Sequence, residues 1–282
     1  RVVRILWQYK KVSFTELSSL LDVAEAVSIV TPTKFHVDVA AACIQAGKHV
    51  FIEKPITTTL EEADRLLLLA KEKGTMIQVG HIERLNPALL ALQPFTIYPK
   101  FIEIQRLAPY TTRGTDVPVV LDLMIHDIDI ILNLIQSKVV NINVLGASVF
   151  SKKDDLVNAQ LEFENGSIAN IIASRASQIQ IRTLSVTQKD SYVVLDYTDQ
   201  EIYVHRKSSS EHKLSKDSLR YKQESLVERI FVHKDNPLKL ELKHFLDCAT
   251  NGHQRKVAID NELYSLEIAL NILGQFNRNH RK

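Results

Sequence analysis

The chain is poor in glycine. Glycine makes up 8 of its 282 residues, against an average usage of about 7%, and the first glycine is Gly47. The Gly-x-Gly-x-x-Gly turn that binds dinucleotide phosphates therefore has no counterpart in residues 1–46. If the chain binds a nucleotide, residues outside such a glycine turn must make the contacts.

Cysteine and net charge are also low, and long apolar runs are missing. Cys43 and Cys248 lack the spacing of a metal knuckle or a redox pair, so we expect buried thiols in a reducing compartment. The 35 basic and 33 acidic side chains give a net charge of +2, which provides no overall field for nucleic acid or an anionic membrane. No apolar run reaches the ~18 residues of a membrane span, and residues 1–10 lack a signal-like apolar core. We expect a cytoplasmic protein without nucleic-acid or membrane partners.

Strands and helices alternate up to about residue 80. Three apolar runs predict strands, and three segments of helical periodicity predict helices. The strands are expected at residues 26–30, 49–52 and 76–79, and the helices at 13–21, 35–46 and 60–73. Ser13 and Thr59 begin segments with capping-box spacing, and Gly47 and Gly74 stand where helices end. This alternation is typical of βαβ units on a parallel sheet.

Beyond Pro99 the pattern changes to strands with few helices between them. The strands are expected at residues 101–106, 139–149, 159–164, 167–174, 182–188, 192–196 and 201–205. Asn165-Gly166 predicts a hairpin turn, because both residues accept positive φ. Residues 208–224 are polar and basic and predict an exposed loop, and late helices are expected at 238–250 and 261–276. The fold class is therefore α/β: a Rossmann-type parallel sheet domain, then an α/β domain with a large, mostly antiparallel open sheet.

The first candidate site follows the apolar strand at residues 49–52, which leads into Glu53 and Lys54. Ligands of open α/β sheets bind outside the carboxyl ends of the strands, so both charges are expected over the crevice. A plain surface ion pair at a strand end is an equally good interpretation of these two residues alone.

The second candidate site is a helix at residues 121–132. At about 100° per residue, Asp122, His126 and Asp129 lie on one face, and Asp127 points away. The other directions are apolar, so the helix is expected to be buried, and burying these groups without partners would cost several kcal/mol. An imidazole oriented by a carboxylate for proton transfer fits this face. A satisfied core network remains open, and so does a metal site, although no further His or Cys cluster completes a ligand shell.

Two weaker signals also fall at strand ends. Thr31 and Pro32, followed by His36, lie where a parallel strand enters a helix, and backbone N–H groups there can meet a phosphate or ribose. Arg84 lies just past the next strand. Each of these segments, taken alone, is equally compatible with an ordinary turn.

Together these motifs resemble the Gfo/Idh/MocA family, the glucose-fructose oxidoreductase and inositol dehydrogenase group of nicotinamide-dependent enzymes. The resemblance spans about residues 12–280. The family motifs read here as Thr31, Pro32 and His36, then residues 46–55 ending in Glu53-Lys54-Pro55, then Arg84, Asn86 and Pro87, and finally Asp122, His126 and Asp129.

The resemblance implies a Rossmann domain at residues 1–98 that binds NAD or NADP, and a substrate-binding and oligomerisation domain at 99–282. The family's glycine-turn strand, part of its second βα unit and the acidic residue that reads the adenosine ribose have no counterpart in this chain. Cofactor contacts are implied for Thr31, Pro32, His36, Glu53, Lys54 and Arg84.

The resemblance also implies hydride transfer between nicotinamide and a hydroxyl-bearing carbon of a sugar or nucleotide sugar. Lys54 would stabilise the developing alkoxide, His126 would exchange the hydroxyl proton, and Asp122 would orient the site. Substrate contacts are implied for Lys54, Arg113, Asp122 and His126, and no metal is implied. Residues 79–84, 113–117 and 122–127 look most like members that act on nucleotide sugars such as UDP-N-acetylglucosamine at the C3 hydroxyl.

A different class of function stays open: a non-catalytic binding or scaffold protein that keeps the fold. The missing glycine turn favours it, and the buried titratable residues argue against it.

The strands at residues 182–205 predict an assembly. One face of so broad a sheet can be covered by helices, and the other is expected to meet solvent or a second subunit. Leu184, Val186, Val194 and Tyr203 are the candidate contacts of a homodimer or homotetramer formed through this sheet.

Overall fold

The computed structural model describes residues 13–93, 95, 97–111, 117–208 and 224–279. Its described residues form two compact units. The first contains the chain up to Gly80 together with His244–Arg255, and the second contains His81–Lys243 and the chain from Lys256 onward. The first chain segment of this unit therefore ends directly after its last strand, and residues 81–98, which the resemblance placed in the Rossmann domain, group with the second unit.

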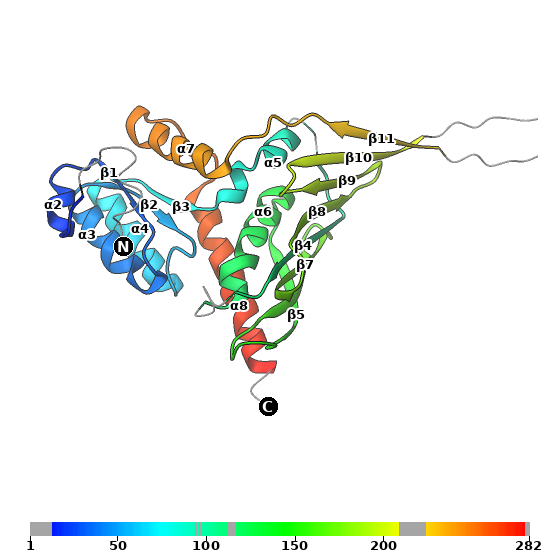
Figure 1. The fold of residues 1–282 in the computed structure, drawn as a ribbon, viewed down its shortest axis with the longest axis horizontal. Helices are drawn as coiled ribbons and strands as arrows, with labels where there is room; N and C mark the ends of the chain where they lie inside the picture. Colours follow the sequence, from blue (N-terminus) through cyan, green and yellow to red (C-terminus); the bar gives the residue numbers. More distant parts are fainter. Residues whose placement is uncertain (1–12, 94, 96, 112–116, 209–223, 280–282) are drawn as a thin grey trace, which may run out of the picture. The chain divides into compact units, whose positions relative to one another are not determined.

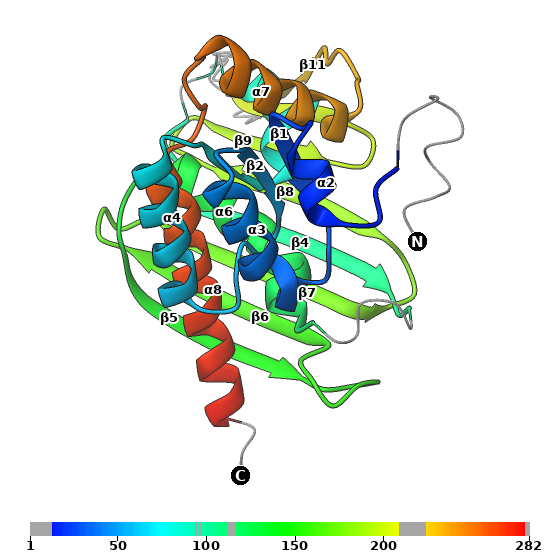
Figure 2. The same cartoon turned by 90° about the vertical axis from the view of Figure 1, so that its left-hand side faces the viewer.

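The first unit is built on a parallel three-stranded sheet in the order β1-β2-β3. The strands are β1 (Ala26–Ile29), β2 (His49–Glu53) and β3 (Ile77–Gly80), and the helices are α2 (Leu17–Leu21), η1 (Thr33–Phe35), α3 (His36–Gln45) and α4 (Leu60–Lys73). Helices α3 and α4 pack next to each other (Figure 2). The predicted alternation of strands and helices on a parallel sheet is confirmed.

A capping box starts α4, and the one predicted for α2 does not form. At α4, the Thr59 side chain accepts from the Glu62 N–H and the Glu62 carboxylate accepts from the Thr59 N–H, and Gly74 ends the helix with φ 65°. At Ser13 the predicted capping box is wrong, because α2 begins only at Leu17. No residue of α2 is buried, so tertiary packing does not stabilise a longer helix there.

The second unit contains an eight-stranded sheet in the order β11-β10-β9-β8-β4-β7-β6-β5. Only the β4–β7 pair is parallel, so the prediction of a mostly antiparallel sheet is confirmed. The strands are β4 (Phe101–Pro109), β5 (Val139–Ala147), β6 (Leu156–Phe163), β7 (Ile168–Ser177), β8 (Ile181–Thr187), β9 (Ser191–Asp196), β10 (Glu201–Ser208) and β11 (Glu224–Ile230). Strand β11 was not predicted, and most of the predicted 208–224 loop lies outside the described residues.

Helices α6 and α8 cover one face of this sheet (Figure 1). The remaining helical elements are η2 (Ile82–Leu85), α5 (Pro87–Leu92), the π-helical turn η3 (Val120–Met124), α6 (Ile125–Ile135), α7 (Pro237–Asn251) and α8 (Ile259–Asn279). None of the helices in the described part of the chain is long and apolar enough to cross a membrane.

The alternation of side chains corrects the predicted contact face. Leu184 and Val186 are fully buried and face the helix layer. Val194 pairs with Ser185 and Tyr203 pairs with Val194, so these residues lie on the opposite face of the sheet. The four predicted contacts cannot share one surface, because paired residues of neighbouring strands point the same way and successive residues point opposite ways.

Candidate active site

In the first unit, His36 connects the turns that follow β1 and β2. Its ring is buried, with Nδ1 3.0 Å from the Pro55 carbonyl oxygen and Nε2 2.8 Å from the Thr31 carbonyl oxygen. His36 therefore lies between two main-chain carbonyls at the carboxyl edge of the sheet and can donate its ring N–H to one of them from inside the fold.

The residues at this edge fit a dinucleotide. Thr31 and Pro32 are exposed, and Glu53 and Lys54 are half-buried. A Cβ at position 80 would lie 3.0 Å from Cζ of Phe51 and 3.1 Å from Oε2 of Glu53, so Gly80 makes room for the Glu53 carboxylate. A carboxylate can accept from ribose hydroxyls, and an ammonium can meet an anion or a developing alkoxide.

In the second unit, Asp122 and His126 lie on two differently wound turns. Asp122 belongs to the π-helical turn η3, and its side chain is 38% exposed. His126 belongs to the first turn of α6 and is 8% exposed. The sequence predicted one regular α-helix here, and the structure replaces its beginning with a wider turn of the kind often found at functional sites.

A second imidazole lies beside His126. The rings of His81 and His126 are edge to face, with centroids 6.1 Å apart and an interplanar angle of 89°. His81 is 2% exposed and precedes η2 directly. The sequence contained only a faint signal for this residue, namely its place immediately after β3.

Asp127 pairs with Arg106 of β4, away from His126. Arg106 donates from Nε and Nη2 to the two carboxylate oxygens of Asp127 at 2.8 and 2.6 Å, and from Nη1 to Glu83 at 2.8 Å. Burial raises the pKa of Asp127, although the Arg106 guanidinium opposes that rise. This charge cluster fixes α6 against the sheet.

Asp129 forms a second charge cluster with Arg84 and Glu262. Arg84 donates to both carboxylate oxygens of Asp129 and, at 2.7 Å, to Glu262 of α8, and Ser265 donates to Asp129 at 3.1 Å. Burial opposes the ionisation of Asp129, but His81 and Arg84 together hold its pKa below the usual range. A satisfied core network was one of the alternatives that the sequence left open, and the structure shows such a network at Asp129. The Arg84 guanidinium binds two carboxylates of its own unit. Its contact with the cofactor stays a prediction.

Asp122 lies near Arg175 of β7, with Nη2 of Arg175 3.7 Å from Oδ2 of Asp122. Asp154 is buried close by, and its Oδ2 accepts from the Val120 N–H at 3.1 Å. The predicted substrate contact Arg113 lies outside the described residues.

We expect Asp154 to make stability depend on pH. Burial raises its pKa from 3.8 to about 6, and the like charge of Asp155 adds to this rise. The Val120 N–H and the Arg175 guanidinium oppose the rise. The folded chain holds this proton more tightly than the unfolded chain, so the contribution of Asp154 to the free energy of unfolding falls as pH rises from about 4 to about 6. About 2 pKa units correspond to at most about 3 kcal/mol.

The Asp154→Asn variant isolates this effect, because Asp155 titrates in both proteins. We expect wild type to lose stability relative to Asp154→Asn between pH 4 and pH 7, measured by urea unfolding at several pH values. Parallel stability curves of the two proteins would show that Asp154 does not titrate in this range.

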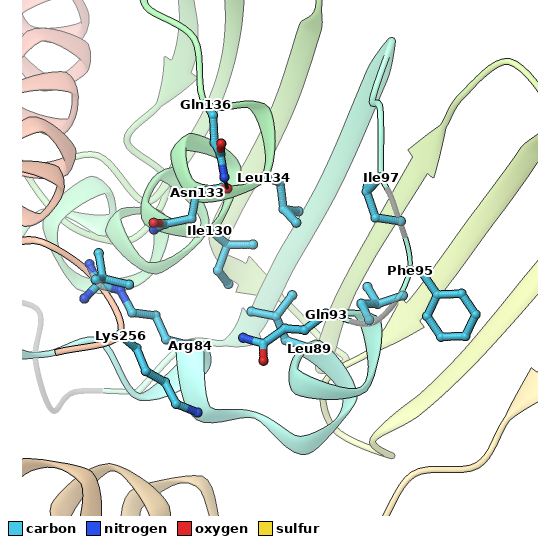
Figure 3. A pocket seen from close by; sticks show the side chains of 12 residues that line it. Arg84, Leu89, Gln93, Phe95, Ile97, Ile130, Asn133, Leu134, Gln136 and Lys256 are labelled. Carbon is cyan, nitrogen blue, oxygen red and sulfur yellow. Dashed lines mark hydrogen bonds between the residues drawn. The ribbon is translucent and has the colours of Figure 1, made fainter. Parts of the chain in front are cut away.

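A cavity of about 380 Å³ lies elsewhere in the second unit, along α5 and the carboxyl-terminal half of α6 (Figure 3). Arg84 and Lys256 lie at one side and apolar side chains at the other. Neither Asp122 nor His126 lines it. The residues with proton-transfer chemistry are therefore placed outside this cavity.

Two sequence profiles match the chain. Residues 4–81 match an oxidoreductase family with an NAD-binding Rossmann fold, and residues 103–192 match the Gfo/Idh/MocA C-terminal domain. A crystal structure of UDP-N-acetylglucosamine 3-dehydrogenase from Acidithiobacillus ferrooxidans superposes with a TM-score of 0.85 at 30% identity, covering 96% of this chain and 85% of that one. The chain belongs to the Gfo/Idh/MocA oxidoreductase family.

Further comparisons agree with this family. A second crystal structure of the same Acidithiobacillus enzyme gives a TM-score of 0.90 at 29% identity, covering 99% of this chain and 87% of that one. The curated sequence of that enzyme is 36% identical over 198 residues, which is 70% of this chain and 63% of the relative. The scyllo-inositol 2-dehydrogenase (NAD(+)) of Bacillus subtilis is 25% identical over 269 residues, covering 89% of this chain and 75% of the relative.

Each of the two units contains the match to one domain of the family. The first unit matches the NAD-binding domain, whose matched segment ends at residue 81, directly after β3. The second unit contains the match to the C-terminal domain. In the described residues, no group of three or more His, Cys, Asp or Glu side chains is arranged to hold a metal ion.

Proposed function

We propose that the chain is an NAD(P)-dependent dehydrogenase acting on a CH–OH group of a sugar or nucleotide sugar. The observation that carries the proposal is the beginning of α6, where a buried imidazole, His126, follows a half-exposed carboxylate, Asp122, by one helical turn. An imidazole can exchange a proton near neutral pH, and a neighbouring carboxylate can orient its partner. The family relationship supplies the redox class.

In this proposal a bound nicotinamide would supply hydride-transfer capacity, in which the hydride carries both electrons of the substrate C–H bond. His126 takes the hydroxyl proton as the carbonyl forms. Lys54 stabilises the negative charge that develops on the substrate oxygen, and Asp122 orients the hydroxyl. Thr31, Pro32, Glu53 and Lys54 would hold the cofactor at the carboxyl edge of the first sheet, and His36 would brace it.

The preferred substrate class is a nucleotide sugar, oxidised at C3 of the hexosamine as in UDP-N-acetylglucosamine. The supporting observation is the name of the Acidithiobacillus relative, whose structures cover nearly all of this chain. An inositol is the competing class, because the Bacillus relative is a scyllo-inositol dehydrogenase.

Calorimetry and turnover on the full polypeptide test this function. We expect NAD or NADP to bind, and UDP-N-acetylglucosamine to be oxidised with a higher kcat/KM than scyllo-inositol. The absence of binding of both cofactors would favour the non-catalytic scaffold. Preferential oxidation of the inositol would overturn the nucleotide-sugar assignment alone.

We also propose a homodimer or homotetramer formed through the sheet face that the helices leave uncovered. Val194 and Tyr203 lie on that face and are only half-buried in the single chain. Light scattering should give two or four times the chain mass of 32.0 kDa. We expect a Val194→Glu, Tyr203→Glu double variant to have a lower mass and retained secondary structure. A monomeric wild type, or an unchanged mass in the variant, would exclude this face as the interface.

A further inference from the structure

Arg175 lies behind the turn that carries Asp122. It projects from β7 with a side chain only 7% exposed, and its own N–H donates to the Asp155 carbonyl at 2.8 Å. Its Nη2 donates to the Val117 carbonyl at 2.8 Å and lies 3.7 Å from Oδ2 of Asp122. One buried guanidinium therefore contacts both the main chain before the turn and the carboxylate on the turn.

The same segment is held at three further points. The Val119 N–H donates to the Asp154 carbonyl at 3.3 Å, and the Val120 N–H donates to the Asp154 carboxylate at 3.1 Å. The Asp122 N–H donates to the Pro118 carbonyl at 2.9 Å. Asp154, just before β6, thus holds the backbone of the turn at two points, and the third bond lies within the turn itself. The Arg175 guanidinium reaches the Asp122 carboxylate.

We propose that Arg175 is a positioning residue that sets the direction of the Asp122 carboxylate for the reaction. The inference rests on the proposed function, in which Asp122 orients the substrate. A guanidinium is always charged, and its planar fork is fixed once one nitrogen donates to the Val117 carbonyl. The carboxylate is therefore held on the side of the turn that faces β7, where it stays partly exposed to a substrate.

A purely structural role makes different predictions. If Arg175 only satisfies buried groups, its removal would lower stability and would reduce activity whether or not Asp122 is present. If Arg175 acts through Asp122, its removal costs nothing further once the carboxylate has been replaced. A double-mutant cycle separates these cases, because coupling between two residues appears as non-additivity.

The experiment measures kcat, KM and NAD(P) affinity in Arg175→Met, Arg175→Lys, Asp122→Asn and the double variant Arg175→Met, Asp122→Asn. We expect Arg175→Met to lower kcat/KM roughly 100-fold, as a misplaced group does, with unchanged cofactor affinity. Arg175→Lys should recover part of the loss, and the double variant should equal Asp122→Asn. The matched control is Arg182→Met on β8, because Arg182 is 39% exposed and contacts Glu83 at 3.8 Å.

Amide hydrogen exchange gives a readout that does not need turnover. We expect exchange in residues 117–124 to rise at least tenfold in Arg175→Met and to stay unchanged in Arg182→Met. Additive losses in the double-mutant cycle, or unchanged exchange in Arg175→Met, would overturn the positioning role. Failure of the proposed function has another signature, namely undiminished turnover in His126→Ala and Lys54→Met.

Discussion

Replacing His126 with alanine is expected to lower kcat roughly 10²- to 10⁴-fold, the usual range for a lost general acid–base group. Replacing Lys54 with methionine is expected to lower it roughly 10²- to 10³-fold, as for a lost oxyanion donor. Both effects arise because the removed group acts on charge that develops only as the hydroxyl becomes a carbonyl. Steady-state kinetics should therefore show large changes in kcat and small changes in KM.

Matched variants control for general damage. His253 and Lys73 are exposed, so His253→Ala and Lys73→Met should leave kcat unchanged. Calorimetric NAD(P) binding should persist in His126→Ala, since the first unit that matches the NAD-binding family does not contain His126. Wild-type turnover in both His126→Ala and Lys54→Met would refute the catalytic assignments.

Asp127→Ala is expected to destabilise the fold by about 3–5 kcal/mol, the usual cost of removing one partner of a buried ion pair. Among the described residues, the variant leaves Arg106, 3% exposed, with Glu83 as its one carboxylate within bonding distance. Urea unfolding followed by circular dichroism measures the loss.

The control is Glu228→Ala, which breaks the exposed pair of Arg206 and Glu228 on β10 and β11. Solvent screens that pair, so its loss should change stability far less. Equal destabilisation of the two variants would mean that burial does not decide the contribution of the Asp127 pair.

Periodicity and turn chemistry predicted much of the fold. The capping box at Thr59 and the alternation of strands and helices correctly indicated α4 and the parallel sheet, because these signals are local. The start of α6 was harder: a π-helical turn differs from an α-helical one by less than one residue, so the pattern around Asp122 looked continuous. The contact face was predicted wrongly because the sequence does not give the register between β8 and β9. Val194 pairs with Ser185, so it lies on the face opposite Leu184 and Val186.

The candidate site was partly visible in the sequence. His126 and Asp122 stood out because polar residues interrupt an apolar helix. The ion-pair partners could not be predicted, since Arg84 and Arg106 lie 45 and 21 residues from the carboxylates they bind. Arg175 was missed because the predicted strand ended at residue 174, whereas β7 continues to Ser177.

The contact between Arg84 and Glu262 joins residues 178 positions apart in the chain. During synthesis, Arg84 and Asp129 leave the ribosome long before α8 does, and one of the two carboxylates that neutralise Arg84 is still missing at that stage. Long-range contacts of this kind form late and slow the completion of a fold. The core of the second unit therefore closes only after translation has passed α8, because the last partner of Arg84 lies on that helix.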